Sequence, residues 1–145
     1  HGLVNNAGIL RDRALVNMSV EDWDTVVRVH LRGHFCMTRH AGAYWRDQSK
    51  AGVDLKPAIV NTTSVVGLFG NFGQANYSSA KGAIAAFTLI CQMELGRYGV
   101  RTNAISPAPA SATVPSAATA PPNSETSSGI CEATQVLPSS SLRKA

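Results

Sequence analysis

The chain has 145 residues and a formal net charge of +4. Its Lys and Arg residues are spread along the sequence, without the basic patch and interleaved aromatic residues that are typical of a nucleic-acid-binding protein. No apolar run is long enough to span a membrane, and the odd number of cysteines favours reduced thiols in a cytoplasmic compartment over a disulfide framework: Cys36, Cys91 and Cys131.

The first predicted element is a buried strand over residues 2–6. Its apolar run leads into Asn5-Asn6-Ala7-Gly8, so small and polar residues stand at its carboxyl end. In open α/β sheets ligands bind just outside the carboxyl ends of the strands. Small side chains there would let a flat cofactor approach the backbone. A turn without a ligand is the alternative that this segment alone leaves open.

A long helix is predicted over residues 20–48. Ser19 followed by Asp22 resembles a capping box at its start. Near its end, Tyr44 and Trp45 are expected in the core or in a subunit contact. Apolar residues at helical spacing predict one buried face: Trp23, Val26, Val27, Leu31, Phe35 and Thr38.

His30 and His34 are four residues apart in this helix, a spacing that suits a metal site. A metalloprotease-type pair needs Glu directly after the first His, but Leu31 stands there. No carboxylate ligand is evident nearby, so no metal is expected.

A second buried strand is predicted over residues 58–63 and delivers Ser64 at its carboxyl end. The loop over residues 65–75 contains three glycines and two phenylalanines. We expect it to form one wall of a substrate pocket, although ordinary loop packing explains each side chain equally well. The candidate lining residues are Leu68, Phe69, Phe72 and Gln74.

The next helix, over residues 75–98, places Tyr77 and Lys81 on one face, because the two residues are four apart. A lone Tyr-x-x-x-Lys pattern is a weak signal, since both residue types are common on exposed helix faces. Gly96 and Gly99 end the helix. A third strand is predicted over residues 100–106, and the alternation of strands and helices indicates a doubly wound parallel α/β sheet.

Composition changes abruptly after Pro107. All aromatic residues precede this point, whereas residues 108–145 are mostly Ser, Pro, Ala and Thr. Such a segment cannot bury much apolar surface, so we expect a low-complexity, disordered tail attached to a partial Rossmann-like segment over residues 1–107. The abrupt change suggests a reading-frame shift or a mis-joined gene end, and the start within a strand suggests a fragment.

Asn5-Asn6-Ala7-Gly8, Ser64 and Tyr77-Ser78-Ser79-Ala80-Lys81 together resemble the short-chain dehydrogenase/reductase family. The segments NAGILRDR (6–13), VHLRG (29–33) and GNFGQANY (70–77) are more similar to its (3R)-hydroxyacyl-CoA dehydrogenase branch, which includes peroxisomal multifunctional enzymes and actinobacterial relatives. The resemblance covers roughly residues 1–107. A eukaryotic multifunctional enzyme of this type would be peroxisomal.

The resemblance implies a Rossmann-like fold and an NAD- or NADP-dependent oxidoreductase that acts on a secondary alcohol or ketone, with 3-hydroxyacyl and 3-oxoacyl thioesters, such as acyl-CoA, as the expected substrates. Ser64, Tyr77 and Lys81 would be catalytic. Asn5, Ala7, Gly8, Tyr77 and Lys81 would bind the cofactor, and Ser64, Gln74 and Tyr77 the substrate.

The resemblance also gives His30 a role. Most of the family has Asn at this position, and its main-chain carbonyl links the catalytic Lys to solvent through a water molecule. The role survives a change to His, so His30 is a further catalytic candidate. A helix residue without any role in the reaction is the alternative.

The family pattern also implies a homodimer or homotetramer built on the two long helices. No Gly-x-Gly-x-x-Gly segment occurs in the chain, and the residue that separates NAD from NADP is missing with it. We therefore expect the chain alone to be inactive and to leave a sheet edge unpaired. Two other assignments stay open: an inactive remnant or interaction module, and a 3-oxoacyl-carrier-protein reductase or a dehydrogenase of steroids or small alcohols.

Overall fold

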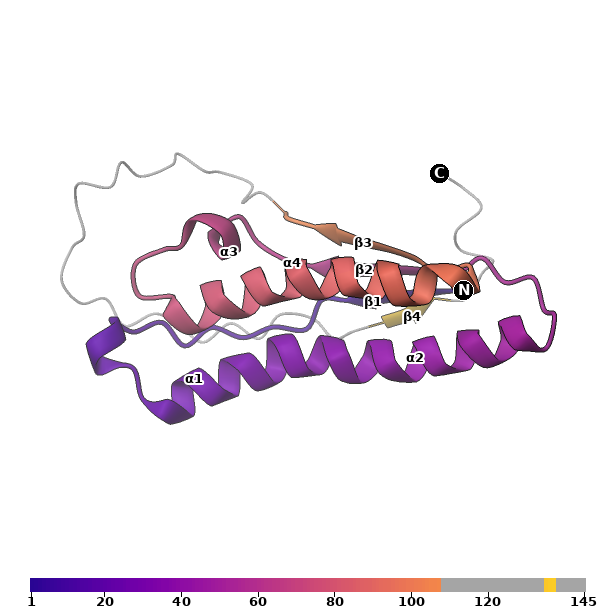
Figure 1. The fold of residues 1–145 in the computed structure, drawn as a ribbon. Helices are drawn as coiled ribbons and strands as arrows, with labels where there is room; N and C mark the ends of the chain where they lie inside the picture. Colours follow the sequence, from indigo (N-terminus) through magenta and orange to yellow (C-terminus); the bar gives the residue numbers. More distant parts are fainter. Residues whose placement is uncertain (108–134, 138–145) are drawn as a thin grey trace.

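The structure of the chain is a computed structural model that describes residues 1–107 and the backbone of residues 135–137 (Figure 1). It contains a four-stranded sheet in the order β3-β2-β1-β4. β1 (Gly2–Asn5) pairs in parallel with β2 (Ala58–Thr62), and β2 pairs in parallel with β3 (Arg101–Ile105). The short β4 (Gln135–Leu137) runs antiparallel to β1.

The helices alternate with the parallel strands, which confirms the predicted Rossmann-like α/β class. β1 leads into α1 (Val20–Val27), a π-helical turn (Arg28–Arg32) and α2 (Gly33–Lys50), and β2 leads through α3 (Val66–Phe69) into α4 (Ala75–Leu95). Figure 1 shows α2 and α4 side by side along one face of the sheet. Parallel strands joined by crossovers of one hand place both helices there.

The long helix predicted for residues 20–48 is present, but a π-helical turn interrupts it. Val26 and Thr38 are buried as expected. Trp23 and Phe35 are not: 37% and 49% of their surfaces are exposed. α1, which carries Trp23, extends past the ends of the strands in Figure 1 and packs mainly against α4 and the π turn. Phe35, which follows the π turn, lines an open groove between α2 and α4 instead of the core.

The predicted start of the first long helix at Ser19 and the predicted glycine end of the second are confirmed. The Ser19 hydroxyl accepts a hydrogen bond from the Asp22 amide at 3.0 Å at the start of α1. Beyond α4, a short 3₁₀ turn (Gly96–Tyr98) leads to Gly99, whose φ of +80° lies in the left-handed region that Gly adopts without strain.

Between the sheet and the helices lies a small apolar core followed by a polar layer. Trp45 from α2 packs with strand residues Leu3 and Ile59 and with Val100, so the predicted core position of Trp45 is confirmed, whereas Tyr44 is half exposed. Closer to the carboxyl ends of the strands, Asn5 and Asn61 are fully buried neighbours in register on β1 and β2. This register is specific, because a one-residue slip would leave both amides without partners.

The predicted loop over residues 65–75 contains the short helix α3, which the sequence analysis missed. α3 packs closely on α4. A Cβ on Gly67 would come within 2.7 Å of the Gly82 nitrogen, and one on Gly82 within 2.7 Å of the Gly67 oxygen. The absence of a side chain at both glycines therefore lets α3 approach α4 closely, next to Lys81.

The predicted disordered tail falls on residues 108–134 and 138–145, which lie outside the described part of the chain. Residues 135–137 form β4, which the sequence analysis did not predict. β4 pairs with β1, so the expectation that this edge of the sheet stays unpaired is wrong for β1. Among the described residues, no helix combines the length and the apolar character that crossing a bilayer requires.

Candidate functional site

Tyr77 and Lys81 lie in the first turns of α4, beside the carboxyl end of β2. Lys81 is only 3% exposed, and its Nζ donates a hydrogen bond to the Thr62 carbonyl at 2.7 Å. The same Nζ lies 5.5 Å from the centre of the Tyr77 ring. A buried ammonium group is costly unless it is hydrogen-bonded. The end of β2 therefore holds the Lys81 cation at a fixed place next to the phenol.

Ser64 follows β2 and begins the turn into α3. It is half-buried, and its carbonyl accepts a hydrogen bond from the Gly67 amide at 2.9 Å. The neighbouring Thr63 donates its hydroxyl to the Lys81 carbonyl at 2.8 Å. The strand end that carries Ser64 is thus tied to the helix turn that carries Lys81. One turn hydrogen bond and one short hydroxyl side chain set the position of this part of the site.

His30 comes from the π turn, and its ring packs edge-on against the Tyr77 ring, with 5.1 Å between the centroids and an interplanar angle of 86°. Its Nε2 lies 2.8 Å from the Ile9 carbonyl and 3.1 Å from the Ile9 amide, so either tautomer finds a partner. Burial lowers the pKa of His30, and Lys81 lowers it further. A neutral imidazole therefore supports the phenol ring on the side of the loop after β1.

His34 is buried one turn further on, and its Nδ1 lies 2.7 Å from the His30 carbonyl, where it donates a hydrogen bond. Burial is the main cause that lowers the pKa of His34 to about 4, with a further contribution from the Lys81 charge. The two histidines are thus joined through the main chain. No group of three or more His, Cys, Asp or Glu side chains suited to a metal occurs in the part of the chain that the structure describes.

Gly8 fits under His30. A Cβ on Gly8 would lie 2.5 Å from the His30 Cε1, and the ring has little freedom to move because Ile9 and Tyr77 hold it. Packing against this His is therefore a reason for Gly at position 8, beside the close cofactor approach that the sequence suggested. Ala7 is half-buried next to it.

We predict that Gly8→Ala lowers the free energy of unfolding by about 1–3 kcal/mol, because the added methyl overlaps the fixed ring. The same change in a His30→Asn background should cost much less, since the smaller side chain leaves room. Urea unfolding of the four proteins of this double-mutant cycle measures the coupling. Gly33→Ala is the control, because its nearest neighbour would be 3.9 Å away. Equal losses in both backgrounds would contradict the packing explanation.

The Asn5 side chain points into the polar layer of the core. Its Nδ2 donates to the Thr38 hydroxyl at 3.1 Å and to the Asn61 Oδ1 at 2.9 Å, and Asn61 donates in turn to the Thr88 hydroxyl at 3.0 Å. These four residues join β1 and β2 to α2 and α4. Asn5 braces the sheet and so holds the strand end that carries Ala7.

Gln74 connects the two loops that border the site. Its Nε2 donates to the Asp12 carboxylate at 2.9 Å, and its Oε1 accepts from Asn71 at 3.1 Å. Arg13 donates its amide to the Gly73 carbonyl at 2.8 Å in the same contact. Both ends of the Gln74 amide are therefore engaged within the chain.

Asn76 is a buried polar residue that the sequence analysis did not single out. It is 0% exposed and directly precedes Tyr77 in the first turn of α4. Asn is a poor helix former, because its side chain competes for backbone groups. An Asn beside a candidate catalytic Tyr was thus an available signal for a specific local hydrogen-bond role.

The short chain dehydrogenase family model matches residues 1–122. The chain is 57% identical over 107 residues to a hydroxyacyl-CoA dehydrogenase of Mycobacterium tuberculosis. This alignment covers 72% of this chain and 34% of that protein. The chain is 43% identical over 105 residues to a 3-oxoacyl-[acyl-carrier-protein] reductase of Thermotoga maritima, with 72% and 40% covered.

Among solved structures, a short chain dehydrogenase from Mycobacterium avium superposes with a TM-score of 0.71 at 56% identity. The superposition covers 72% of this chain and 37% of that one. The chain spans between 34% and 40% of the length of each of these three relatives. Residues 1–122, which the family model matches, contain the two long helices, the three parallel strands and all the site residues described above.

Proposed function

The chain belongs to the short-chain dehydrogenase family, and from this premise we propose that the complete protein is an NAD(P)-dependent oxidoreductase of 3-hydroxyacyl and 3-oxoacyl thioesters. The observation that carries the proposal is the buried Lys81 ammonium, fixed by the Thr62 carbonyl 5.5 Å from the Tyr77 ring centre. The names of the Mycobacterium tuberculosis and Thermotoga maritima relatives support the substrate class.

Tyr77 exchanges the proton of the substrate hydroxyl in this proposal. The pKa of a free phenol is about 10. Lowering this pKa to about 7 requires roughly 4 kcal/mol of stabilisation of the phenolate relative to the phenol. A nearby cation favours the phenolate, which is the role of Lys81. Ser64 orients the substrate oxygen and stabilises charge that develops on it. His30 contributes by supporting the Tyr77 ring.

A nicotinamide cofactor, when bound, would carry the hydride that the protein side chains cannot carry. The residues present suit its reactive half. Lys81 supplies a buried ammonium donor, Tyr77 a hydroxyl, and Ala7 and Gly8 give a strand end with little side-chain bulk. Asn5 would act indirectly, by bracing that strand. The test below distinguishes NAD from NADP.

The substrate side would be bounded by Ser64, Tyr77 and the wall that Gln74 holds in place. Because both ends of the Gln74 amide are already bonded, we assign it to the wall rather than to a direct contact with the substrate. Three apolar side chains of α3 and the loop that follows it are more than 70% exposed and suit an acyl chain: Leu68, Phe69 and Phe72.

The test is turnover by the full-length gene product. A 3-hydroxyacyl-CoA and the matching acyl-carrier-protein thioester are each offered with NAD and with NADP, and reduced cofactor is followed by absorbance at several chain lengths. Saturable turnover of the CoA thioester supports the proposal, and a preference for the carrier-protein thioester favours a reductase like the Thermotoga maritima relative. Cofactor binding without turnover of either substrate, or no cofactor binding, would contradict it.

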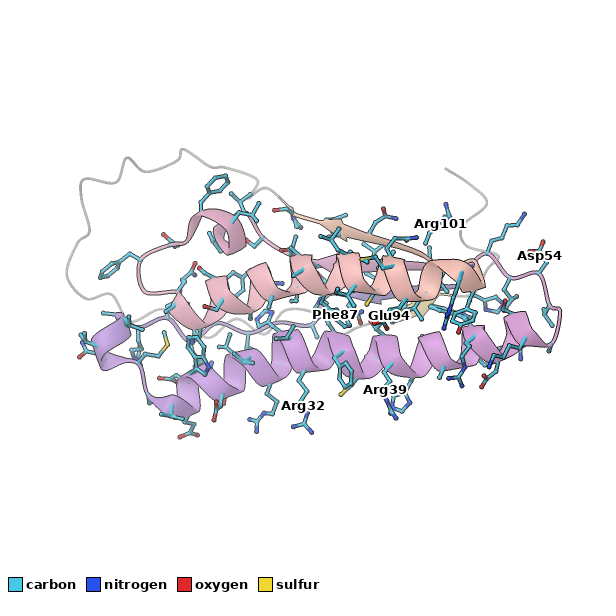
Figure 2. The ribbon with its side chains drawn as sticks, in the orientation of Figure 1. Arg32, Arg39, Asp54, Phe87, Glu94 and Arg101 are labelled. Carbon is cyan, nitrogen blue, oxygen red and sulfur yellow. The ribbon has the colours of Figure 1, made fainter. Side chains whose placement is uncertain are left out.

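The proposed assembly is a homodimer or homotetramer. A groove of about 820 Å³ lies between α2 and α4, and Figure 2 shows Phe87 and Glu94 on the side of α4 that faces α2. Exposed Phe35 and Met93 line it, together with Arg39. A second copy is the occupant that we propose, because the groove carries exposed apolar side chains together with charges of both signs, Arg39 and Glu94, a mixture that suits a self-complementary two-fold contact. A monomeric mass for the full-length protein in light scattering would refute this.

A cytoplasmic location is also proposed, because Cys36 and Cys91 are free thiols. Cell fractionation checks this.

A further inference from the structure

We propose that Asn76 is a positioning residue for Tyr77, which ties the start of the catalytic helix to the loop after β1. The inference rests on the proposed function, because it assigns to Tyr77 the proton exchange at the same site. Asn76 itself touches neither the substrate nor the reacting atoms. It acts by fixing the backbone that carries the phenol.

The contacts of Asn76 use its whole side-chain amide. Its Nδ2 donates to the Arg11 carbonyl at 3.0 Å and lies 3.3 Å from the Asp22 carbonyl, and its Oδ1 accepts from the Tyr77 amide at 2.7 Å. These partners belong to the loop after β1, to α1 and to α4. In sequence they are 65, 54 and one residue away. One buried side chain therefore joins three segments at the residue next to Tyr77.

The loop after β1 supports Tyr77 in two independent ways. Ile9 holds the His30 ring, which packs against the Tyr77 ring, and Arg11 holds Asn76, which binds the Tyr77 amide. On the opposite side, the Lys81 ammonium is held by the Thr62 carbonyl at the end of β2. The distance between phenol and ammonium thus depends on how the loop after β1 and the end of β2 are fixed relative to each other, and Asn76 is a direct link between α4 and that loop.

Asn is the side chain that these partners require. Two main-chain carbonyls need donors, and the Tyr77 amide needs an acceptor. Asp has the same shape and keeps the acceptor, but it would place carboxylate oxygens against two carbonyls. Comparing Asn76→Asp with Asn76→Ala therefore separates the link to the loop from the local bond to Tyr77.

The experiment measures kcat and KM of Asn76→Ala, Asn76→Asp and Asn76→Ser in the full-length gene product, together with amide hydrogen exchange of residues 9–13 and 75–80. We expect all three variants to lower kcat by about 10- to 100-fold, as for a misplacement of about 1 Å. KM for the thioester should change less than about threefold, because substrate binding is not the step affected. Exchange should become faster in both segments.

Ile59→Val is the matched control, since it removes one methylene from the apolar core between the sheet and the helices and Ile59 is not part of the site. It should lower the melting temperature and leave kcat unchanged. Wild-type kcat in Asn76→Asp would overturn the proposal, because only the local bond to Tyr77 would then matter. Failure of all three Asn76 variants to fold would also overturn it, in favour of a purely structural role.

The exchange measurement separates this proposal from the proposed function. If the wild-type protein turns over no thioester, the proposed function fails. The exchange rates of Asn76→Asp still show whether Asn76 ties α4 to the loop after β1. Faster exchange in residues 9–13 then supports it, and unchanged exchange there overturns it.

Discussion

Replacing Tyr77 by Phe in the full-length gene product is expected to lower kcat by about 10²- to 10⁴-fold, the usual contribution of one general acid–base group. The ring and its edge-on contact with His30 remain, so the change removes only the hydroxyl. KM should stay within a few-fold of wild type. Steady-state kinetics with a 3-hydroxyacyl-CoA and the preferred cofactor measure both constants.

Tyr44→Phe is the matched control for this variant. Tyr44 is 51% exposed on α2, and loss of its hydroxyl should leave kcat unchanged. Far-ultraviolet circular dichroism and the melting temperature establish that Tyr77→Phe is folded. Wild-type kcat in a folded Tyr77→Phe protein would remove Tyr77 from the reaction and would leave the proposed mechanism without its proton-exchanging group.

Stability should fall on acidification because of His34. Its pKa is about 4 in the folded protein and near 6.5 when unfolded, so between these values the unfolded chain binds the extra proton. At pH 7 the His34 side chain is neutral in both the folded and the unfolded protein, so its titration does not change the free energy of unfolding. As the pH falls from about 6.5 to about 4, the free energy of unfolding should drop by up to about 3 kcal/mol. His30 contributes with the same sign, because burial lowers its pKa too.

Urea unfolding at a series of pH values between 4 and 8 measures this dependence. His34→Gln keeps a polar side chain but does not titrate, so its stability should decline less steeply below about pH 6.5. It should also be less stable than wild type at pH 7, because the Nδ1 bond to the His30 carbonyl is lost. His40→Gln, at an exposed position of α2, is the control. Parallel pH profiles for His34→Gln and wild type would contradict the assignment.

Local pattern predicted the elements well where one simple periodicity held. Apolar runs predicted β1, β2 and β3 to within about a residue, and the helical start at Ser19 followed from its side-chain chemistry. The same approach failed at the π turn, because the helical periodicity assumes 3.6 residues per turn. It also failed at α3 and β4. α3 is packed against Gly82, and β4 is paired with a strand more than 130 residues away, contacts that no local pattern encodes.

The candidate site divides in the same manner. The spacing of Tyr77 and Lys81 placed them on one helix face, and Ser64 was expected at a strand end, but their catalytic roles came from the family resemblance. The sequence did not show why Gly8 and Asn76 stand near these residues in the folded protein. Gly8 is opposite His30 because the β1 loop folds over the π turn, and Asn76 is buried because three separate segments converge on it.

By itself, the sequence determined the α/β class and the order of strands and helices, because these depend on short-range periodicity, and its motifs identified the candidate acid–base residues through their resemblance to a known family. Only the tertiary structure decided that Lys81 is buried on the Thr62 carbonyl, that His30 and His34 are neutral supports, and that Asn76 and Gln74 join loops. The physical reason is that burial, desolvation and hydrogen-bond partners are properties of contacts between distant segments.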